Sequence, residues 1–429
     1  MIISIVGTGY VGLVTGAIFA DLGHKVFCID IDRQKIKALS QGDLPFFEPG
    51  LEELVKRNII QKRLFFTNDY SLSVPKSKVV FICVGTPANL DGEADLSYLF
   101  SAVTQAANHL KGYTLIAIKS TVPIGVEKEL EKLISQKAST RYEFASCPEF
   151  LREGSAVEDA QNPDRIVIGT KSKKAADLLL DLYKHMNGQR IICDLRSAQM
   201  IKYAANSFLA TKISFANAVA NLCEATQADA EVVLQGVGSD KRIGRAFLYP
   251  GVGYGGSCFP KDISAFISLG KRYNYNFDLL KAVNSINSQQ IDFFVEKVEK
   301  ALGNLKGKQL AVLGISFKPN TDDIREAPSI KIIHSLLEKG AEIKAYDPVS
   351  VNNARRVLPK EVIFDHDPYT ALTDCQALLL ITEWNEFKEL DLEKVKRLMK
   401  KPVIIDGRNI YDPAKVKQLG FIYQGIGRS

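Results

Sequence analysis

The chain has little of what marks a metalloprotein or a disulfide-stapled protein. It has five histidines and seven cysteines in 429 residues, and none of them stands in the spacing of a metal site. We therefore expect no metal. The cysteines are scattered, odd in number and never in Cys-x-x-Cys spacing. This pattern argues against a disulfide framework and indicates a reducing compartment, so we expect a cytoplasmic protein.

Long apolar runs and a strong charge bias are also missing. No run approaches the ~20 apolar residues that a membrane span needs, and the apolar N-terminus lacks the basic segment of a signal peptide. A net charge of +6 is mild for this length. It suits a small anionic ligand but gives no argument for nucleic acid. The length allows two or three domains of ordinary globular composition.

The first thirty residues have the pattern of a dinucleotide-binding unit. The β-branched run Ile2-Ile3-Ser4-Ile5-Val6 precedes Gly7-Thr8-Gly9-Tyr10-Val11-Gly12, and a helix of small and apolar residues follows through Ala20. A second expected strand, Lys25-Val26-Phe27-Cys28-Ile29, runs into Asp30. The pattern matches G-x-G-x-x-G with the strand, helix and acid in their required places.

Each part of this motif has a physical role. Gly7 makes the tight turn, Gly9 lets the backbone approach a pyrophosphate, and Gly12 lets helix and strand pack closely. The phosphates then lie at the helix N-terminus, which favours anions. Asp30 is placed to hold a ribose 2′-hydroxyl and would repel a 2′-phosphate, so NAD is favoured over NADP; Lys35 weakens that preference slightly.

Strands and helices alternate through both ends of the chain. Further strands are expected at 78–84 and 114–119, and a second set at 309–314, 342–347, 377–382 and 402–406. Long helices are expected at 198–228 and 285–300. The predicted fold is α/β, with two doubly wound Rossmann-like domains joined by a long central helix and a helical dimerisation region. The second domain lacks the glycine motif, so it binds a nucleotide differently or binds no dinucleotide.

These segments divide the chain into three expected domains. Residues 1–195 form a dinucleotide-binding domain, and residues 196–302 form a central helical domain suited to pairing with a second subunit. Residues 303–429 form the second Rossmann-like domain, and the Gly303 to Lys308 segment marks its boundary.

The segment Gly253-Tyr254-Gly255-Gly256-Ser257-Cys258-Phe259-Pro260-Lys261-Asp262 delivers one cysteine in a glycine-rich loop. A thiolate is a strong nucleophile, and nearby positive charge favours it. Cys258 alone would more simply be a buried small hydrophobe. Four glycines between 251 and 256, however, keep side chains away from the thiol, which a packed core does not require. The loop therefore indicates covalent attack on a carbonyl carbon.

Together these features resemble the UDP-glucose/GDP-mannose dehydrogenase family along the whole chain. Besides the first glycine motif and the cysteine loop, the matching segments are Val84-Gly85-Thr86-Pro87, Lys119-Ser120-Thr121-Val122-Pro123, Pro148-Glu149-Phe150-Leu151-Arg152-Glu153-Gly154, Lys202-Tyr203-Ala204-Ala205-Asn206, Gly314-Ile315-Ser316-Phe317-Lys318 and Asp406-Gly407-Arg408.

The resemblance implies a four-electron oxidation of a sugar primary alcohol to a carboxylate, with two NAD reduced. UDP-glucose, giving UDP-glucuronate, is the substrate that it favours. The thiol then has a reason: its addition to the intermediate aldehyde makes a thiohemiacetal, whose oxidation gives a thioester that water opens.

The resemblance also implies roles for single residues. Cys258 is the nucleophile, Lys202 stabilises an oxyanion, and Asp262 acts as a base or positions water. Thr121 and Glu149 handle protons, with Glu149 the better candidate for thioester hydrolysis. Asn206 shares a helical face with Lys202 and hydrogen-bonds the substrate or a water.

Ligand contacts are implied for a larger set. The cofactor site comprises Gly7, Gly9, Tyr10, Val11, Gly12, Asp30, Lys35, Thr86, Thr121, Glu153, Lys261 and Arg325. The sugar-nucleotide site comprises Glu149, Phe150, Leu151, Arg152, Glu153, Lys202, Asn206, Phe247, Leu248, Tyr249, Pro250, Gly251, Gly255, Lys318 and Arg408. Arg242 is implied to reach the substrate of a neighbouring subunit, which makes a homodimer functional.

Other readings stay open at this point. Sister dehydrogenases that act on GDP-mannose or on UDP-N-acetyl-hexosamines differ only in substrate. A sugar-nucleotide epimerase or dehydratase would need a Tyr-x-x-x-Lys pair, and a non-enzymatic NAD-binding scaffold would not need Cys258, Lys202 and Asp262. Trp384 could stack on a base but is more often a packing residue.

Overall fold

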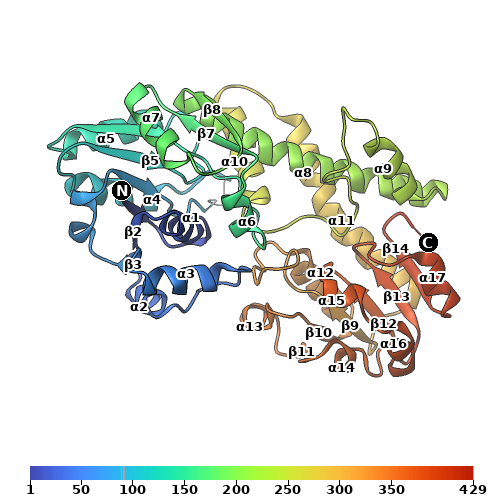
Figure 1. The fold of residues 1–429 in the computed structure, drawn as a ribbon. Helices are drawn as coiled ribbons and strands as arrows, with labels where there is room; N and C mark the ends of the chain where they lie inside the picture. Colours follow the sequence, from blue (N-terminus) through green and yellow to red (C-terminus); the bar gives the residue numbers. More distant parts are fainter. Residues whose placement is uncertain (88, 90–91, 429) are drawn as a thin grey trace. The chain divides into compact units, whose positions relative to one another are not determined.

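The computed structural model describes residues 1–87, 89 and 92–428, so every residue predicted to bind or react is described. The chain divides into two compact units (Figure 1). Unit 1 comprises Met1–Ala205 and Ser264–Tyr275, and unit 2 comprises Asn206–Ile263 and Asn276–Ser429. Helices α8 (Leu195–Thr226) and α10 (Phe259–Arg272) belong partly to each unit.

Within its described residues, unit 1 is built on an eight-stranded sheet in the order β3-β2-β1-β4-β5-β6-β7-β8. Neighbouring strands are parallel except β6 and β7, which pair antiparallel. Its first six strands have the order of a doubly wound dinucleotide fold. The strands are β1 (Ile2–Val6), β2 (Lys25–Ile29), β3 (Leu64–Thr67), β4 (Val79–Ile82), β5 (Thr114–Ile118), β6 (Tyr142–Ser146), β7 (Arg165–Gly169) and β8 (Gln189–Cys193).

Helices and short 3₁₀ turns connect these strands. They are α1 (Tyr10–Asp21), α2 (Arg33–Gln41), α3 (Leu51–Ile60), η1 (Tyr70–Leu72), η2 (Val74–Lys76), α4 (Ser97–Asn108), α5 (Glu127–Lys137), α6 (Ala156–Gln161) and α7 (Lys173–Leu182).

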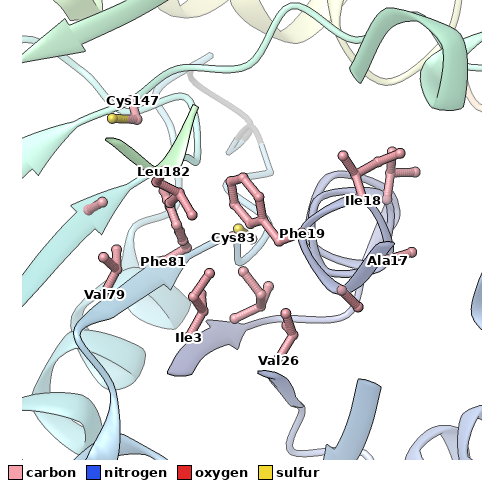
Figure 2. Close-up of a cluster of buried hydrophobic side chains, with 14 of the residues drawn as sticks. Ile3, Ala17, Ile18, Phe19, Val26, Val79, Phe81, Cys83, Cys147 and Leu182 are labelled. Carbon is pink, nitrogen blue, oxygen red and sulfur yellow. The ribbon is translucent and has the colours of Figure 1, made fainter. Parts of the chain in front are cut away.

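The core of unit 1 packs α1 against the sheet. Figure 2 shows Phe19 reaching from α1 towards Phe81 of β4, close to Cys83. The Phe19 and Phe81 rings stack with centroids 5.4 Å apart, and both side chains are buried. Since β-branched and aromatic residues suit a sheet buried on both faces, the apolar strands and the small-residue helix assemble here. The glycine loop between β1 and α1 is thereby held on a rigid base.

Unit 2 contains a six-stranded parallel sheet, counted over its described residues, in the order β11-β10-β9-β12-β13-β14. This is the same doubly wound order as in unit 1, so the prediction of two Rossmann-like domains is confirmed. The strands are β9 (Gln309–Leu313), β10 (Glu342–Tyr346), β11 (Ile363–Phe364), β12 (Ala377–Leu380), β13 (Val403–Asp406) and β14 (Ile422–Gly425). The helices are α9 (Ala230–Gly238), α11 (Asp278–Leu302), α12 (Pro328–Glu338), α13 (Val351–Ala354), α14 (Pro368–Leu372), α15 (Asn385–Lys388), α16 (Leu392–Leu398) and α17 (Pro413–Gln418).

The predicted long helices are present with shifted ends. The helix expected at 198–228 is α8, which begins three residues earlier and ends at Thr226. The helix expected at 285–300 is α11, which begins at Asp278. Gly303, with φ of +73°, ends α11 before β9, because glycine adopts this backbone region without strain.

Candidate active site and nucleotide sites

The glycine loop of unit 1 fits the pyrophosphate of a dinucleotide. Gly7 has φ of +95°, and a Cβ at Gly12 would lie 1.9 Å from the Gly7 carbonyl oxygen, so neither position accepts a side chain. At Gly9, by contrast, a Cβ would find no described atom within 4 Å. The loop therefore leaves open space at the N-terminus of α1, where backbone N–H groups favour phosphate.

Asp30, directly after β2, is held by its own loop. Its Oδ2 accepts hydrogen bonds from the Thr8 backbone N–H (2.9 Å), the Thr8 hydroxyl (2.6 Å) and Lys35 Nζ (3.1 Å). Burial acts to raise the pKa of Asp30, but these hydrogen bonds and the Lys35 charge outweigh it and lower the pKa. Oδ1 accepts from Asp32 N–H at 3.1 Å and keeps capacity for one further donor such as a ribose hydroxyl.

Two further predicted cofactor residues are in contact with each other. The Thr86 hydroxyl donates to the Thr121 carbonyl oxygen at 2.9 Å. Their loops follow β4 and β5, which are neighbouring parallel strands. The structure thus brings Thr86 and Thr121 to the carboxyl edge of the sheet, where ligands bind in this fold.

Glu149 and Lys202 form a buried ion pair in unit 1. Lys202 Nζ donates to Glu149 Oε1 at 2.7 Å, and the Leu151 backbone N–H donates to Oε2 at 2.6 Å. Burial alone would raise the pKa of Glu149, but the Lys202 charge and hydrogen bonds lower it. Lys202 also lies 5.5 Å from the centre of the Phe150 ring. Lys202 is therefore a buried, paired lysine rather than an exposed surface residue.

The other residues of the 148–154 segment differ in environment. Arg152 is exposed and pairs with Asp159 through its guanidinium, with a shortest distance of 2.5 Å. Glu153 is buried. Leu151 lies partly buried against the core of unit 1.

In unit 2, the predicted residues around the thiol form a connected set. Cys258 immediately precedes α10, and its carbonyl oxygen accepts from the Asp262 N–H at 2.9 Å. Asp262 is buried, and its carboxylate accepts from Asn206 Nδ2 (2.6 Å) and Lys261 Nζ (2.5 Å). Because α10 begins directly after Cys258, Cys258 and Asp262 lie one helical turn apart.

The glycines of this loop permit close packing of the loop itself. A Cβ at Gly255 would lie 2.2 Å from the Glu326 carbonyl oxygen, and one at Gly256 would lie 2.8 Å from the Phe317 ring. The Gly256 N–H donates to the Arg325 carbonyl at 2.8 Å. Asn287 of α11 holds Tyr254 through both backbone groups, at 2.8 and 3.1 Å. The sequence had suggested open room around the thiol, whereas these two glycines serve contact with the 317–326 segment.

The 247–251 segment and Arg408 are also neighbours in unit 2. A Cβ at Gly251 would lie 3.1 Å from an Arg408 terminal nitrogen, and Arg408 donates to the Gly253 carbonyl at 3.1 Å. Phe247 has φ of +65°, a strained conformation for a bulky residue that the surrounding structure must hold in place. The remaining predicted substrate residues of this unit are buried Leu248 and Pro250, exposed Tyr249, and Lys318 with its ammonium 5.5 Å from the Phe317 ring centre.

Two predicted arginines are largely exposed and paired with nearby acids. Arg325 forms a two-pronged ion pair with Asp323, with a shortest distance of 2.6 Å. Arg242 pairs in the same way with Asp240, and its side chain is 89% exposed. An exposed guanidinium of this kind is available to reach a ligand or a second chain.

The acid that directly follows β10 is more deeply buried than Asp30, the acid in the matching position of unit 1. Asp347 is 2% exposed, and its carboxylate accepts from the backbone N–H groups of Ile315, Ser316, Val349 and Ser350. The indole of buried Trp384 also donates to Asp347, at 3.3 Å. Trp384 is therefore a packing residue, and the Asp347 carboxylate, unlike that of Asp30, is not available to a ribose.

The sequence analysis missed Glu48. This carboxylate is 4% exposed and contacts Tyr10 of the glycine loop and the backbone after Glu153. The only sequence signal is an acid within an otherwise apolar and proline-glycine segment, Phe46-Phe47-Glu48-Pro49-Gly50, which has no periodic pattern.

A dinucleotide-binding domain and a thiol at a helix N-terminus are typical of a nicotinamide-dependent dehydrogenase that forms a covalent intermediate. Comparison with protein families agrees, and the chain belongs to the UDP-glucose/GDP-mannose dehydrogenase family. Residues 1–187 match the family's NAD binding domain, residues 196–289 its central domain and residues 311–413 its UDP binding domain. NAD as the cofactor and a UDP-binding C-terminal part follow from these matches.

Individual relatives match over nearly their full length. The chain is 47% identical to the UDP-glucose 6-dehydrogenase TuaD of Bacillus subtilis, over 99% of this chain and 93% of the relative. It is 42% identical to a UDP-glucose 6-dehydrogenase of Pseudomonas aeruginosa, over 100% and 98%.

Solved structures show the same fold. A UDP-glucose dehydrogenase from Pyrobaculum islandicum is 38% identical with a TM-score of 0.93, covering 100% of this chain and 98% of that one. A UDP-D-ManNAc dehydrogenase from Pyrococcus horikoshii is 29% identical with a TM-score of 0.86, covering 100% and 99%. Among the described residues, no helix is both long enough and apolar enough to cross a membrane.

Proposed function

We propose that this protein oxidises UDP-glucose to UDP-glucuronate with two molecules of NAD. The observation that carries this proposal is the position of Cys258 at the N-terminus of α10, one turn before buried Asp262. A helix N-terminus favours a thiolate, and a thiolate is what a second oxidation of an aldehyde requires. Bound NAD supplies the hydride acceptor for both oxidations.

The chain's own groups hold and activate the sugar carbon. Cys258 adds to the aldehyde carbon and keeps it covalently bound until water releases the acid and restores the thiol. Lys202, buried and cationic, stabilises the negative charge that develops on the sugar oxygen. Asn206, which donates to Asp262, fixes that carboxylate as a base or as an anchor for water.

Glu149 and Thr121 complete the proton handling. The lowered pKa of Glu149 keeps it ionised near neutral pH, as a base for thioester hydrolysis must be. Thr121 assists through its hydroxyl, while its carbonyl oxygen is occupied by Thr86.

The ligand sites are proposed as the sequence indicated. NAD is held by the glycine loop 7–12, Asp30, Lys35, Thr86, Thr121, Glu153, Lys261 and Arg325. The UDP-sugar is held by residues 149–153, 247–251, Lys202, Asn206, Gly255, Lys318 and Arg408, with Arg242 supplied by a second subunit.

The choice of UDP-glucose rests on the relatives. Those at 42–47% identity are named UDP-glucose 6-dehydrogenases, whereas the UDP-D-ManNAc enzyme of known structure is only 29% identical. GDP-mannose and UDP-N-acetyl-hexosamines are therefore the comparison substrates in the test below.

We further propose a homodimer in the cytoplasm, with domains at 1–195, 196–302 and 303–429. The central part of α8 exposes Phe208, Phe215 and Leu222, at 66%, 51% and 65%. Their spacing places them along one side of the helix. A large apolar stripe of this kind is typical of a subunit contact. All seven cysteines lie among the described residues and none of them forms a disulfide, which suits a reducing compartment.

The experiment is a count of NADH formed per sugar consumed. UDP-glucose should yield about two NADH for each carboxylate released, and GDP-mannose and UDP-N-acetylglucosamine should yield little. Cys258→Ser should abolish acid release, while Cys193→Ser, a half-exposed cysteine outside the loop, should not. A ratio near one, or full turnover in Cys258→Ser, would reject the mechanism.

A further inference from the structure

Glu48 is buried in unit 1 beside the glycine loop, although it belongs to no strand or helix. Its Oε1 accepts from the Ala156 backbone N–H at 2.7 Å, and its Oε2 accepts from the Gly154 N–H at 2.6 Å. The Tyr10 hydroxyl donates to the same Oε2. The carboxylate thus joins the start of α6 to the start of α1.

Tyr10 is held at both ends of its side chain by the same short segment. Its ring packs against Phe46 with centroids 5.1 Å apart, and its hydroxyl is bound by Glu48. Tyr10 is also the residue of the glycine loop with which α1 begins. Since the backbone of this loop is where a pyrophosphate binds, the segment 46–48 sets the position of the loop.

The other partner of Glu48 is the end of the segment that carries Glu149 and Glu153. That segment is fixed near its start by the Lys202–Glu149 ion pair. At its end, the Gly154 N–H is shared between Glu48 and the Tyr10 hydroxyl, which it reaches at 3.0 Å. Gly154 has φ of +80°, so its N–H is directed by a backbone turn that glycine favours.

We propose that Glu48 is a positioning residue that couples the NAD loop, through Tyr10, to the 148–154 segment that carries Glu149. It needs to touch neither ligand. The proposed function enters this proposal only through UDP-glucose, the substrate of the kinetic measurements.

The protonation states agree with this geometry. Burial and the neighbouring Glu48 raise the pKa of the Tyr10 hydroxyl, so it stays a donor at every working pH. Burial also raises the pKa of Glu48, while the hydrogen bonds from Tyr10 and the α6 backbone act against that rise.

The test compares Tyr10→Phe, Glu48→Gln and the double variant in the full-length protein. Tyr346→Phe is the matched control, because its hydroxyl also donates to a glutamate, Glu386, at 3.1 Å but lies in unit 2. NADH affinity is measured by fluorescence, together with kcat, KM for NAD and for UDP-glucose, and Tm.

Tyr10→Phe removes the hydrogen bond to Glu48 and the acceptor that the Gly154 N–H shares, and it should weaken NADH binding about tenfold. It should lower kcat less than Glu48→Gln does, because Glu48 still holds Gly154 and Ala156. Glu48→Gln should lower both NADH affinity and kcat. The double variant should be no worse than Glu48→Gln alone, because both changes break one linkage.

Unchanged NADH affinity in Tyr10→Phe, with or without a lower Tm, would overturn the proposal. So would additive losses in the double variant. If Glu48→Gln does not fold, Tyr10→Phe against Tyr346→Phe decides alone. NADH binding needs no sugar, so failure of the UDP-glucose assignment would show as lost turnover with NADH binding intact.

Discussion

Lys202 and Glu149 are 3% and 7% exposed, and their charged atoms lie 2.7 Å apart. A buried ion pair contributes little net stability by itself, but loss of one partner leaves an uncompensated charge. The pair is therefore a sensitive reporter of the proposed site, and it can be tested by stability as well as by activity.

Glu149→Gln should destabilise the protein by up to about 3–5 kcal/mol at pH 7, because it removes the carboxylate that pairs with the buried Lys202 ammonium. The pKa of Glu149 is lowered in the folded chain, so its stabilising effect is present above its ordinary pKa of about 4.3 and is lost as pH falls through the folded value. The difference in the free energy of unfolding between wild type and Glu149→Gln should therefore become smaller below about pH 4. Urea unfolding followed by circular dichroism measures it.

The control is Glu52→Gln, which breaks an exposed pair with Lys56 and should leave stability nearly unchanged at all pH values. A Glu149→Gln variant as stable as wild type at pH 7 would show that the Lys202–Glu149 pair does not contribute to stability.

At this scale the sequence predicts residue types better than contacts. Cys258, Asp262 and Lys202 stand out because thiol, acid and base near glycines or in an apolar helix suit few structural roles. Glu48 does not stand out, because its partners, Tyr10 and Gly154, are brought to it by tertiary packing from 38 and 106 residues away.

Among the elements, the cysteine loop depends most closely on backbone fit. Gly255→Ala should force the loop away from Glu326, since the new Cβ would lie 2.2 Å from a carbonyl oxygen. We expect a loss of about 1–3 kcal/mol of stability and at least about a tenfold loss of kcat, because a displacement of the thiol by about 1 Å is costly. Calorimetry and steady-state kinetics measure the two effects.

Gly236→Ala in α9 is the matched control. There a Cβ would meet no described atom within 4 Å. Since alanine favours a helix more than glycine does, Gly236→Ala should increase the free energy of unfolding by about 0.5–1 kcal/mol. Equal behaviour of the two variants would mean that the loop can yield without loss of function.

Strands and helices with clear periodic patterns were predictable, and their ends were not. The expected strand 377–382 stops at Leu380. The antiparallel step between β6 and β7 could not be predicted, since both strands are short and composition does not encode strand direction.

For the whole molecule, the open question is whether Arg242 serves its own site or a partner's. Arg242→Ala and Cys258→Ser subunits, co-expressed with different tags and purified as hybrids, should recover about half of wild-type activity if the arginine acts across the dimer. In such hybrids one site combines an intact cysteine with the partner's intact arginine. Steady-state NADH formation measures the recovery.

A hybrid of wild type with a subunit carrying both changes is the converse control. It should be inactive if Arg242 acts across the dimer, and half active if each arginine serves its own subunit. The second pattern would contradict the proposed role of the homodimer.

The burial of Asp347 has a kinetic consequence. The second sheet repeats the strand order of the first. Its Asp347 carboxylate stands where a ribose contact would be expected, but it already accepts hydrogen bonds from backbone N–H groups of its own unit. This carboxylate is therefore not available to the ribose of an NAD molecule. We expect no substrate inhibition by NAD through a contact between Asp347 and a ribose.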